Sequence, residues 1–148
     1  MITFITKTFN ELTNTELYQL LQLRNEVFIV EQTCPYPDMD DKDYKALHVL
    51  GMENDRMVAY TRLLPLGISY KEASIGRVVT SQAVRRFGYG KQLMDYSIAE
   101  TKKRFDTNEI VISAQSYLEK FYSDLGFVSE GETYLEDDIP HIKMRYKA

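Results

Sequence analysis

Two hydrophobic periodicities alternate along the chain and predict its secondary structure. Short stretches in which apolar and polar residues alternate, or in which apolar residues run together, are typical of β-strands. The seven predicted strands are residues 2–9, 47–52, 57–64, 72–80, 109–114, 127–135 and 141–146. Other stretches carry apolar residues at helical spacing, which favours amphipathic helices. The three predicted helices are residues 13–32, 91–104 and 117–125.

The order of these elements predicts a mixed sheet. Because strands 72–80 and 109–114 are joined through a helix, we expect them to be parallel neighbours in a βαβ crossover. Residues 53–56 have the composition of a hairpin turn, which would make the strands on either side antiparallel. The expected fold class is therefore α/β, of the mixed α+β kind. It would have a central, mostly antiparallel sheet of about seven strands, with helices on both faces.

Local signals mark the ends of two predicted helices. Thr13 and Glu16 have the spacing of a capping box at the start of the first helix. The prolines that follow end that helix, and an acidic loop extends from Cys34 to Tyr44. Gly126 stands where a C′ glycine would close the third helix. The acidic loop contains Asp38, Asp40, Asp41 and Asp43.

A stretch with two glycines, between a predicted strand and the second predicted helix, is a candidate binding site. Its sequence is Arg85-Arg86-Phe87-Gly88-Tyr89-Gly90, and Lys91 follows. Glycines let a backbone approach a ligand closely, and the first amides of a helix have no partner within it. These amides and the helix dipole favour an anion such as phosphate. The stretch is not a P-loop, and it lacks the third glycine of a dinucleotide fingerprint.

Length, charge and cysteine content narrow the class of protein. A chain of 148 residues is expected to form a single domain, residues 1–148. The formal net charge of −4 argues against nucleic acid as the main partner, because phosphate contacts need clustered Lys and Arg. The sequence has one cysteine, no signal-peptide pattern at its start and no apolar run long enough to span a membrane. We therefore expect a cytoplasmic protein.

A second candidate lies in the third predicted helix, with the sequence Phe121-Tyr122-Ser123-Asp124-Leu125-Gly126-Phe127. A tyrosine near the end of a short helix can donate a proton to a leaving group. A tyrosine can also pack its ring in the core and hydrogen-bond its hydroxyl, which is common. From these residues alone, both interpretations of Tyr122 remain open.

Together, these two stretches resemble the GCN5-related N-acetyltransferase (GNAT) superfamily. The resemblance rests on a strand, then Arg85-x-x-Gly88-x-Gly90 opening a helix, then a strand and Phe121-Tyr122-x-x-x-Gly126-Phe127. Within the superfamily the chain resembles the ElaA-like family. The residues that carry this closer resemblance are Leu23, Arg24, Val27, Phe28, Val30, Glu31, Gln32, Cys34, Pro35, Tyr36, Asp40, Ile75, Gly76, Arg77, Val78, Ala114, Gln115, Ile139, Pro140, His141 and Ile142.

The resemblance implies a co-substrate, acetyl-CoA. The residues themselves show no Cys/His cluster at metal-ligand spacing, so no metal is expected. The amides of residues 85–90 and of the first helical turn would hold the pyrophosphate of acetyl-CoA. The backbone of the preceding strand would pair with its pantetheine arm, in a V-shaped gap beside the strand that ends at Ala114. The residues implicated in cofactor binding are Arg77, Val78, Val79, Arg85, Arg86, Phe87, Gly88, Tyr89, Gly90 and Lys91.

The resemblance also implies a mechanism. The acceptor amine would attack the thioester directly, without an acyl-enzyme, and Tyr122 would be the catalytic residue that gives a proton to the leaving thiolate. Cys34 then need not be a nucleophile. This agrees with the absence of basic residues near Cys34 in the sequence that would favour its thiolate.

Arg24, Glu31, His48 and His141 are the candidates for the acceptor site. Arg24 lies on the apolar stripe of the first helix, which Glu31 extends, so it should be paired or line a cavity. Its partner would be Glu31 or a carboxylate of the acidic loop, in a structural ion pair or an acceptor site. Either histidine could relay a proton at neutral pH, or simply be hydrogen-bonded within a strand. Neither a Cys/His cluster nor a complete calcium loop is present in the sequence.

The sequence thus predicts an N-acetyltransferase that transfers an acetyl group from acetyl-CoA to a primary amine. A CoA-binding regulatory or sensor module on the same fold, without turnover, is the alternative, and a longer acyl-CoA is a further one. The acceptor would be a small-molecule or peptide amine. The acidic loop would suit a cationic acceptor such as a polyamine, an aminoglycoside or a peptide lysine. No nucleic-acid or membrane partner is expected, and a homodimer is left open.

Overall fold

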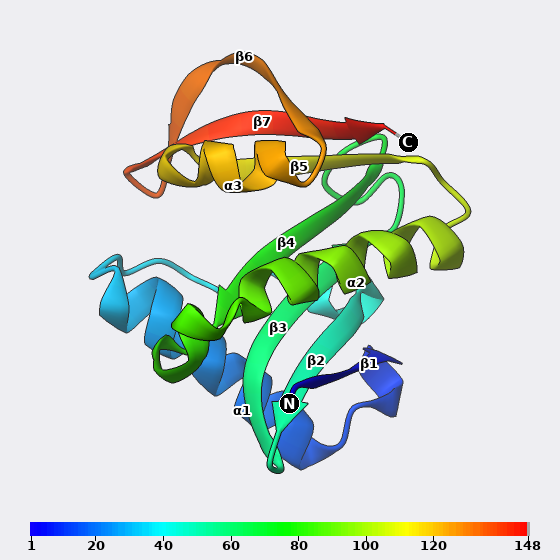
Figure 1. The fold of residues 1–148 in the computed structure, drawn as a ribbon, viewed down its shortest axis with the longest axis vertical. Coiled ribbons are helices and arrows are strands. Elements are labelled where there is room, and N and C mark those ends of the chain that lie inside the picture. The colour runs from blue at the N-terminus through cyan, green and yellow to red at the C-terminus, as the bar shows by residue number, and fades with distance from the viewer. Residues whose placement is uncertain (148) are drawn as a thin grey trace.

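The computed structural model describes residues 1–147, apart from the side chain of Arg86. Within these residues the strands form one seven-stranded sheet in the order β1-β2-β3-β4-β5-β7-β6 (Figure 1). The strands are β1 (Thr3–Thr8), β2 (Leu47–Glu53), β3 (Arg56–Leu64), β4 (Ala73–Thr80), β5 (Glu109–Gln115), β6 (Phe127–Glu136) and β7 (Ile139–Lys147). The predicted fold class is confirmed.

The pairing of the sheet is weakest in its middle, between β4 and β5. These strands are the parallel neighbours expected from the βαβ crossover, but only Ala73 pairs with Ile110 and Ser74 with Val111. The other neighbouring strands pair antiparallel over greater lengths. Past Ser74 the two strands diverge, and Figure 1 shows β4 crossing from the β5–β7–β6 side towards the β1–β3 side.

Helices cover both faces of this sheet. They are α1 (Asn14–Arg24), α2 (Tyr89–Arg104) and α3 (Glu119–Asp124). α1 packs into one hydrophobic cluster through Leu23, whereas α2 and α3 pack into another through Leu93 and Tyr122. Val49 and Leu50 of β2 belong to different clusters, because successive side chains of a strand point to opposite faces.

The segment predicted as one helix over residues 13–32 changes type in its middle. It is α-helical to Arg24 and then forms a π-helix, Asn25–Glu31. The amide of Gln32 donates to the carbonyl of Val27 at 3.2 Å. Because this carbonyl lies five positions earlier, the bond is of the π-helical kind. So short a stretch cannot reveal by its apolar spacing which of the two helix types it will adopt.

The predicted helix ends are confirmed at two places. The hydroxyl of Thr13 accepts from the amide of Glu16, and the Glu16 carboxylate accepts from the amide of Thr13, which completes the capping box. Gly126 follows the C-cap of α3 with a φ of 108°, as a C′ glycine does.

Three predicted boundaries are wrong. The connection expected over residues 136–140 is shorter, because β6 and β7 extend into it and only Asp137 and Asp138 turn the chain. Both have positive φ, 51° and 63°, as a two-residue hairpin turn requires. The second helix starts earlier, at Tyr89, after a 3₁₀ helix over Gln82–Phe87. The third begins as a 3₁₀ turn over Ser116–Leu118.

Gly51 on β2 is expected to tolerate no side chain. A Cβ added there would lie 2.7 Å from the Cβ of Ala59 and 3.2 Å from its carbonyl oxygen. We expect Gly51→Ala to lower the free energy of unfolding, measured by urea denaturation, by about 1–3 kcal/mol through overpacking. Gly76→Ala on β4 is the matched control, because nothing lies within 4 Å of a Cβ added there. Equal losses in the two variants would contradict this explanation.

Candidate active site

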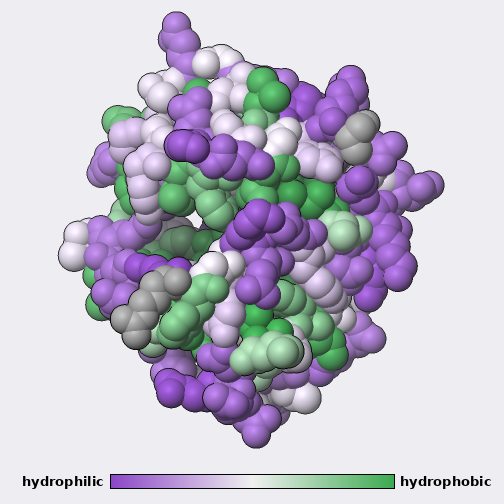
Figure 2. All heavy atoms as spheres, in the orientation of Figure 1, coloured by the Kyte–Doolittle hydropathy of each residue, from purple (hydrophilic) through white to green (hydrophobic). Residues whose placement is uncertain are grey.

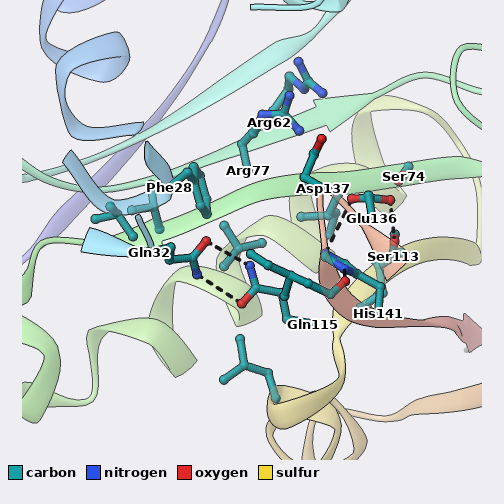
Figure 3. Close-up of a pocket in the computed structure, with 18 of the residues that line it drawn as sticks. Phe28, Gln32, Arg62, Ser74, Arg77, Ser113, Gln115, Glu136, Asp137 and His141 are labelled. Carbon is teal, nitrogen blue, oxygen red and sulfur yellow. Dashed lines mark hydrogen bonds and ion pairs between the residues drawn. The ribbon is translucent and has the colours of Figure 1, made fainter. Parts of the chain in front are cut away.

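A cavity of about 770 Å³ occupies the place where β4 and β5 diverge. Its walls come from β4, the end of β5, the start of α2, α3, the π-helix with the loop after it, and the β6–β7 turn. Figure 2 shows the surface hollowed on the left of the view, and Figure 3 shows the lining side chains. Segments far apart in the sequence therefore share one site.

The start of α2 forms one end of the cavity, at Gly90. Gly88, with a φ of 74°, separates the preceding 3₁₀ helix from α2. The amides of Tyr89, Gly90 and Lys91 come before the first intrahelical bond, which the amide of Gln92 makes to the carbonyl of Gly88 at 3.4 Å. These donors and the positive end of the helix dipole suit an anion.

Arg85 lies at the same end of the cavity and is held by Glu31 of the π-helix. Its Nη1 and Nη2 donate to the two carboxylate oxygens of Glu31, at 2.5 and 2.7 Å. The hydrogen bonds from Arg85 lower the pKa of the Glu31 carboxyl. Glu31 is therefore the partner of Arg85, and the expectation that it could pair with Arg24 is wrong.

β4 is irregular where it borders the cavity. Tyr60 of β3 pairs with Val79, and Arg62 pairs with Gly76, so β4 has one residue more than β3 in this interval. Arg77 takes up the extra length with a φ of 49°. Since β4 has no β5 partner beyond Ser74, residues 77–79 face the cavity with backbone groups that are free of pairing to β5.

Tyr122, from α3, also lines the cavity. Its ring is buried, with Phe121 and Phe127 against it at centroid distances of 5.1 and 5.9 Å. Its hydroxyl makes no hydrogen bond to any residue that the structure describes. Burial raises the pKa of the Tyr122 phenol, so the hydroxyl remains protonated at neutral pH.

Arg24, at the end of α1, is fully buried and binds two aspartates of the acidic loop. Its Nε donates to Asp38 at 2.8 Å, and its Nη1 donates to Asp43, also at 2.8 Å. Its Nη2 adds a bond to the backbone carbonyl of Asp38 at 3.1 Å. The predicted pairing of Arg24 with this loop is confirmed.

Two further arginines bind the same loop and close an arginine–aspartate ring. Arg62 of β3 donates to Asp40 at 2.7 and 3.0 Å and to Asp43 at 3.2 Å. Arg77 of β4 donates to Asp38 at 2.8 Å and to Asp40 at 3.4 Å. Each of these carboxylates thus contacts two guanidinium groups. The members of the ring, in order, are Arg24, Asp38, Arg77, Asp40, Arg62 and Asp43.

The ring lowers the pKa of two of its carboxylates, Asp40 and Asp43. Burial alone would raise the pKa of Asp40, but the hydrogen bonds from Arg62 and the charges of Arg62 and Arg77 bring it down to about 2. The pKa of Asp43 is also lowered, because bonds to Arg24 outweigh its burial. Since each acid of the ring is matched by a base, the loop offers little net negative charge. The charge argument for a cationic acceptor at this loop therefore loses its basis.

Arg24 and His48 do not line the cavity, which corrects their prediction as acceptor residues. The guanidinium of Arg24 is already used by the ring. His48 is buried, with Nδ1 2.6 Å from the Tyr60 hydroxyl and Nε2 2.9 Å from the Asp43 carbonyl oxygen. Burial lowers the pKa of His48. Arg24 thus forms a structural ion pair, and His48 is a hydrogen-bonded histidine within a strand. The other two acceptor candidates, Glu31 and His141, do line the cavity.

The residues predicted to bind a cofactor are brought together only in part. Those that line the cavity are Arg77, Val78, Val79, Arg85 and Gly90. The hydroxyl of Tyr89 donates to Glu53, and Lys91 pairs with Asp95, so their side chains have partners elsewhere. Phe87 is half-exposed beside Tyr89. The prediction for the Arg86 side chain lies outside the described residues.

The sequence did not predict two pairs of polar residues in the cavity, Gln32 with Gln115 and Ser113 with Glu136, as binding residues. Gln32 and Gln115 exchange amide hydrogen bonds of 3.1 and 3.3 Å across it (Figure 3). Ser113 bonds to Tyr134 at 2.5 Å and donates to Glu136 at 3.1 Å. Both glutamines are part of the family resemblance, but Ser113 and Glu136 carry no local signal. Only the pairing of β5 with β7 and of β7 with β6 brings them together.

Nowhere in residues 1–147 do three or more His, Cys, Asp or Glu side chains group as a metal site would need. None of the helices described there has the length and apolar character to cross a membrane.

We expect the ring to make stability sensitive to acid. The folded pKa of Asp40, about 2, lies below its ordinary value of 3.8, so its contribution is present above pH 4 and is lost as the pH falls through 2. Asp40→Asn should cost about 1–2 kcal/mol in urea unfolding at pH 7, and the difference from the unmodified protein should shrink at low pH. Asp41→Asn, at an exposed neighbouring position, is the control. A pH-independent cost of Asp40→Asn would contradict this expectation.

Comparison with known proteins identifies the family. Residues 11–148 match the model of the acetyltransferase (GNAT) domain. Protein ElaA of Escherichia coli K12 is 42% identical over 137 residues, 91% of this chain and 90% of that protein. The crystal structure of an acyl-CoA N-acyltransferase from Pseudomonas aeruginosa matches with a TM-score of 0.91 at 42% identity, over 97% of this chain and 99% of that one. The crystal structure of E. coli ElaA matches with a TM-score of 0.93 at 39% identity, over 99% and 100%. The chain therefore belongs to the GNAT acetyltransferase family, and within it to the ElaA-like proteins.

Proposed function

We propose that this protein transfers an acetyl group from acetyl-CoA to a primary amine. The observation that carries the proposal is that one cavity joins three features: the start of α2, the unpaired edge of β4 and Tyr122. Membership of the GNAT family and similarity to the P. aeruginosa acyl-CoA N-acyltransferase support an acyl-CoA donor.

The residues present fit such a donor. The free amides at the start of α2 would bind the pyrophosphate, and Gly90 leaves room for it to approach the helix. Both Nη atoms of Arg85 already donate to the Glu31 carboxylate, so Arg85 could bind a phosphate only after this ion pair breaks. The backbone of residues 77–79 would pair with the amide groups of the pantetheine arm, as one strand pairs with another.

Tyr122 is suited to act as the general acid. Its hydroxyl is protonated at neutral pH, has no hydrogen-bond partner among the described residues and belongs to the cavity wall. It would give its proton to the thiolate that leaves when the amine attacks the thioester. The alternative, a CoA-binding module without turnover, gives no reason for a tyrosine hydroxyl that belongs to the cavity wall and has no partner among the described residues.

Tyr122→Phe tests the catalytic part of the proposal. We expect kcat to fall about 100-fold, with an unchanged KM for acetyl-CoA, because the variant removes only the proton donor. The measurement is release of free CoA thiol from acetyl-CoA with a panel of primary amines. Tight CoA binding by the unmodified protein without turnover on any amine would favour the module. Unchanged turnover in Tyr122→Phe would remove this residue as the acid.

Gly90→Val tests the donor site. A Cβ at Gly90 would lie 3.7 Å from the ring of Phe121, an ordinary contact, so the variant should fold. Its branches would extend into the cavity, and we expect CoA affinity by calorimetry to fall at least about tenfold. Gln92→Val, an exposed position in the same turn, is the control for the helix propensity of valine. Gly88 is unsuitable, because its φ of 74° would add backbone strain.

Equal CoA affinity in Gly90→Val, Gln92→Val and the unmodified protein would contradict a pyrophosphate site at the start of α2. An affinity lost equally in both variants would point to a general effect on the helix instead.

A further inference from the structure

The β6–β7 hairpin places a carboxylate and a histidine together on the cavity wall. Glu136 ends β6 and His141 lies near the start of β7, with Ser113 of β5 beside them. Figure 3 shows these three side chains gathered at the right of the view, with Arg62 and Arg77 above the centre and Phe28 and Gln32 at the left. The Glu136 carboxylate lies 3.5 Å from Nε2 of His141.

The hydrogen bond at one nitrogen of His141 determines what the other nitrogen can do. Nδ1 lies 2.7 Å from the backbone carbonyl oxygen of Ile139, and since a carbonyl only accepts, Nδ1 must carry a hydrogen. In the neutral ring, Nε2 then holds a free lone pair. The ring is also fixed in place, because its side chain is only 8% exposed and stacks on Tyr134 with a centroid distance of 6.2 Å.

Glu136 has no Lys or Arg partner among the described residues, which distinguishes it from Glu31 and Asp40 in the same cavity. Glu31 is bound by Arg85, and Asp40 is bound within the arginine–aspartate ring. Glu136 accepts a hydrogen bond from Ser113, and none of the described Lys or Arg side chains pairs with it. Its side chain is 48% exposed, so the carboxylate remains open to a cation that enters the cavity.

The surroundings of His141 contain few other charges. From β6 it faces Glu136 and Tyr134, and from β5 it faces Gln115, its partner in the strand pairing. Tyr70, in the loop before β4, lies near Tyr134 and Glu136. Burial, followed by the effect of these two neighbours, raises its pKa to about 12, so it is neutral. Asp137 of the turn also lines the cavity. Glu136 and Asp137 are thus the negative groups on this wall, and the ammonium of Lys143, two residues further along β7, lies 5.7 Å from the centre of the Tyr70 ring.

We propose that His141 is the general base for the acceptor amine and that Glu136 binds its ammonium group. This inference rests on the proposed acetyl transfer. The acceptor enters as an ammonium ion, Glu136 accepts a hydrogen bond from it, and Nε2 of His141 takes one proton, which then passes to solvent. The freed lone pair forms the C–N bond to the thioester carbonyl, and the C–S bond breaks. A second proton leaves the nitrogen and replaces the one that Tyr122 gives to the thiolate.

Steady-state kinetics with acetyl-CoA and three amine probes, butylamine, putrescine and lysine amide, test the two roles separately. We expect His141→Gln to lower kcat about 100-fold and to abolish the fall in rate on acidification that protonation of the imidazole causes. Glu136→Gln should mainly raise the KM for the amine, about tenfold, and leave the KM for acetyl-CoA unchanged. Glu132→Gln, an exposed position on the same strand, is the control.

Spectroscopy supplies a readout that a structural role would not give. The chain has two histidines, so ¹⁵N NMR resolves both imidazoles, and His141→Gln identifies their signals. We expect His141 to carry its hydrogen on Nδ1 at pH 8. Urea unfolding and CoA affinity of the variants check that the fold and the donor site are retained.

Three results would overturn the assignment. The first is a hydrogen on Nε2 of neutral His141, which would leave no lone pair towards the cavity. The second is turnover in His141→Gln with an unchanged rate and pH profile, which would leave the proposed function intact and remove only the base. The third is a lack of turnover by the unmodified protein on every probe while it binds CoA. That result would count against the proposed function itself and leave this base without a reaction.

Discussion

The arginine–aspartate ring is the interaction on which the site depends. Its arginines come from α1, β3 and β4, and its aspartates all come from the loop between the π-helix and β2. A buried charge is stable only when it is paired, so none of these elements can move without breaking a pair. The ring thereby attaches a loop with little regular structure to the sheet. That loop and the π-helix before it form one wall of the cavity.

The ring also separates the charge that builds the fold from the charge that is available to a ligand. The loop pairs with Arg24, Arg62 and Arg77, although the buried Nε of Arg62 has no hydrogen-bond partner among the described residues, and Glu31 pairs with Arg85. The helix amides at the start of α2 and the Glu136–His141 pair are not bound to these arginines. Under the proposed acetyl transfer, the anionic donor would use the amides and the acceptor amine would use the carboxylate–histidine pair.

Sequence reasoning succeeded where the signal is local. The Thr13–Glu16 capping box, the C′ glycine Gly126 and the crossover between β4 and β5 follow from spacing, handedness and connection length. It failed where long-range contacts decide. Whether Arg24 pairs with Glu31 or Asp38 depends on a π-turn that apolar spacing does not reveal, and Ser113 meets Glu136 only through the sheet.

The short pairing between β4 and β5, two residues on each strand, has a thermodynamic consequence. A sheet that stops pairing after Ser74 leaves the edge of β4 without the bonds that a complete sheet would make. A ligand whose own amides fill that edge supplies the missing strand, so its binding resembles a last step of folding. Because such a ligand binds the folded chain and not the unfolded one, its affinity adds directly to the stability of the protein. The two halves of the sheet should then unfold as one unit when the ligand is bound, and less cooperatively when it is absent.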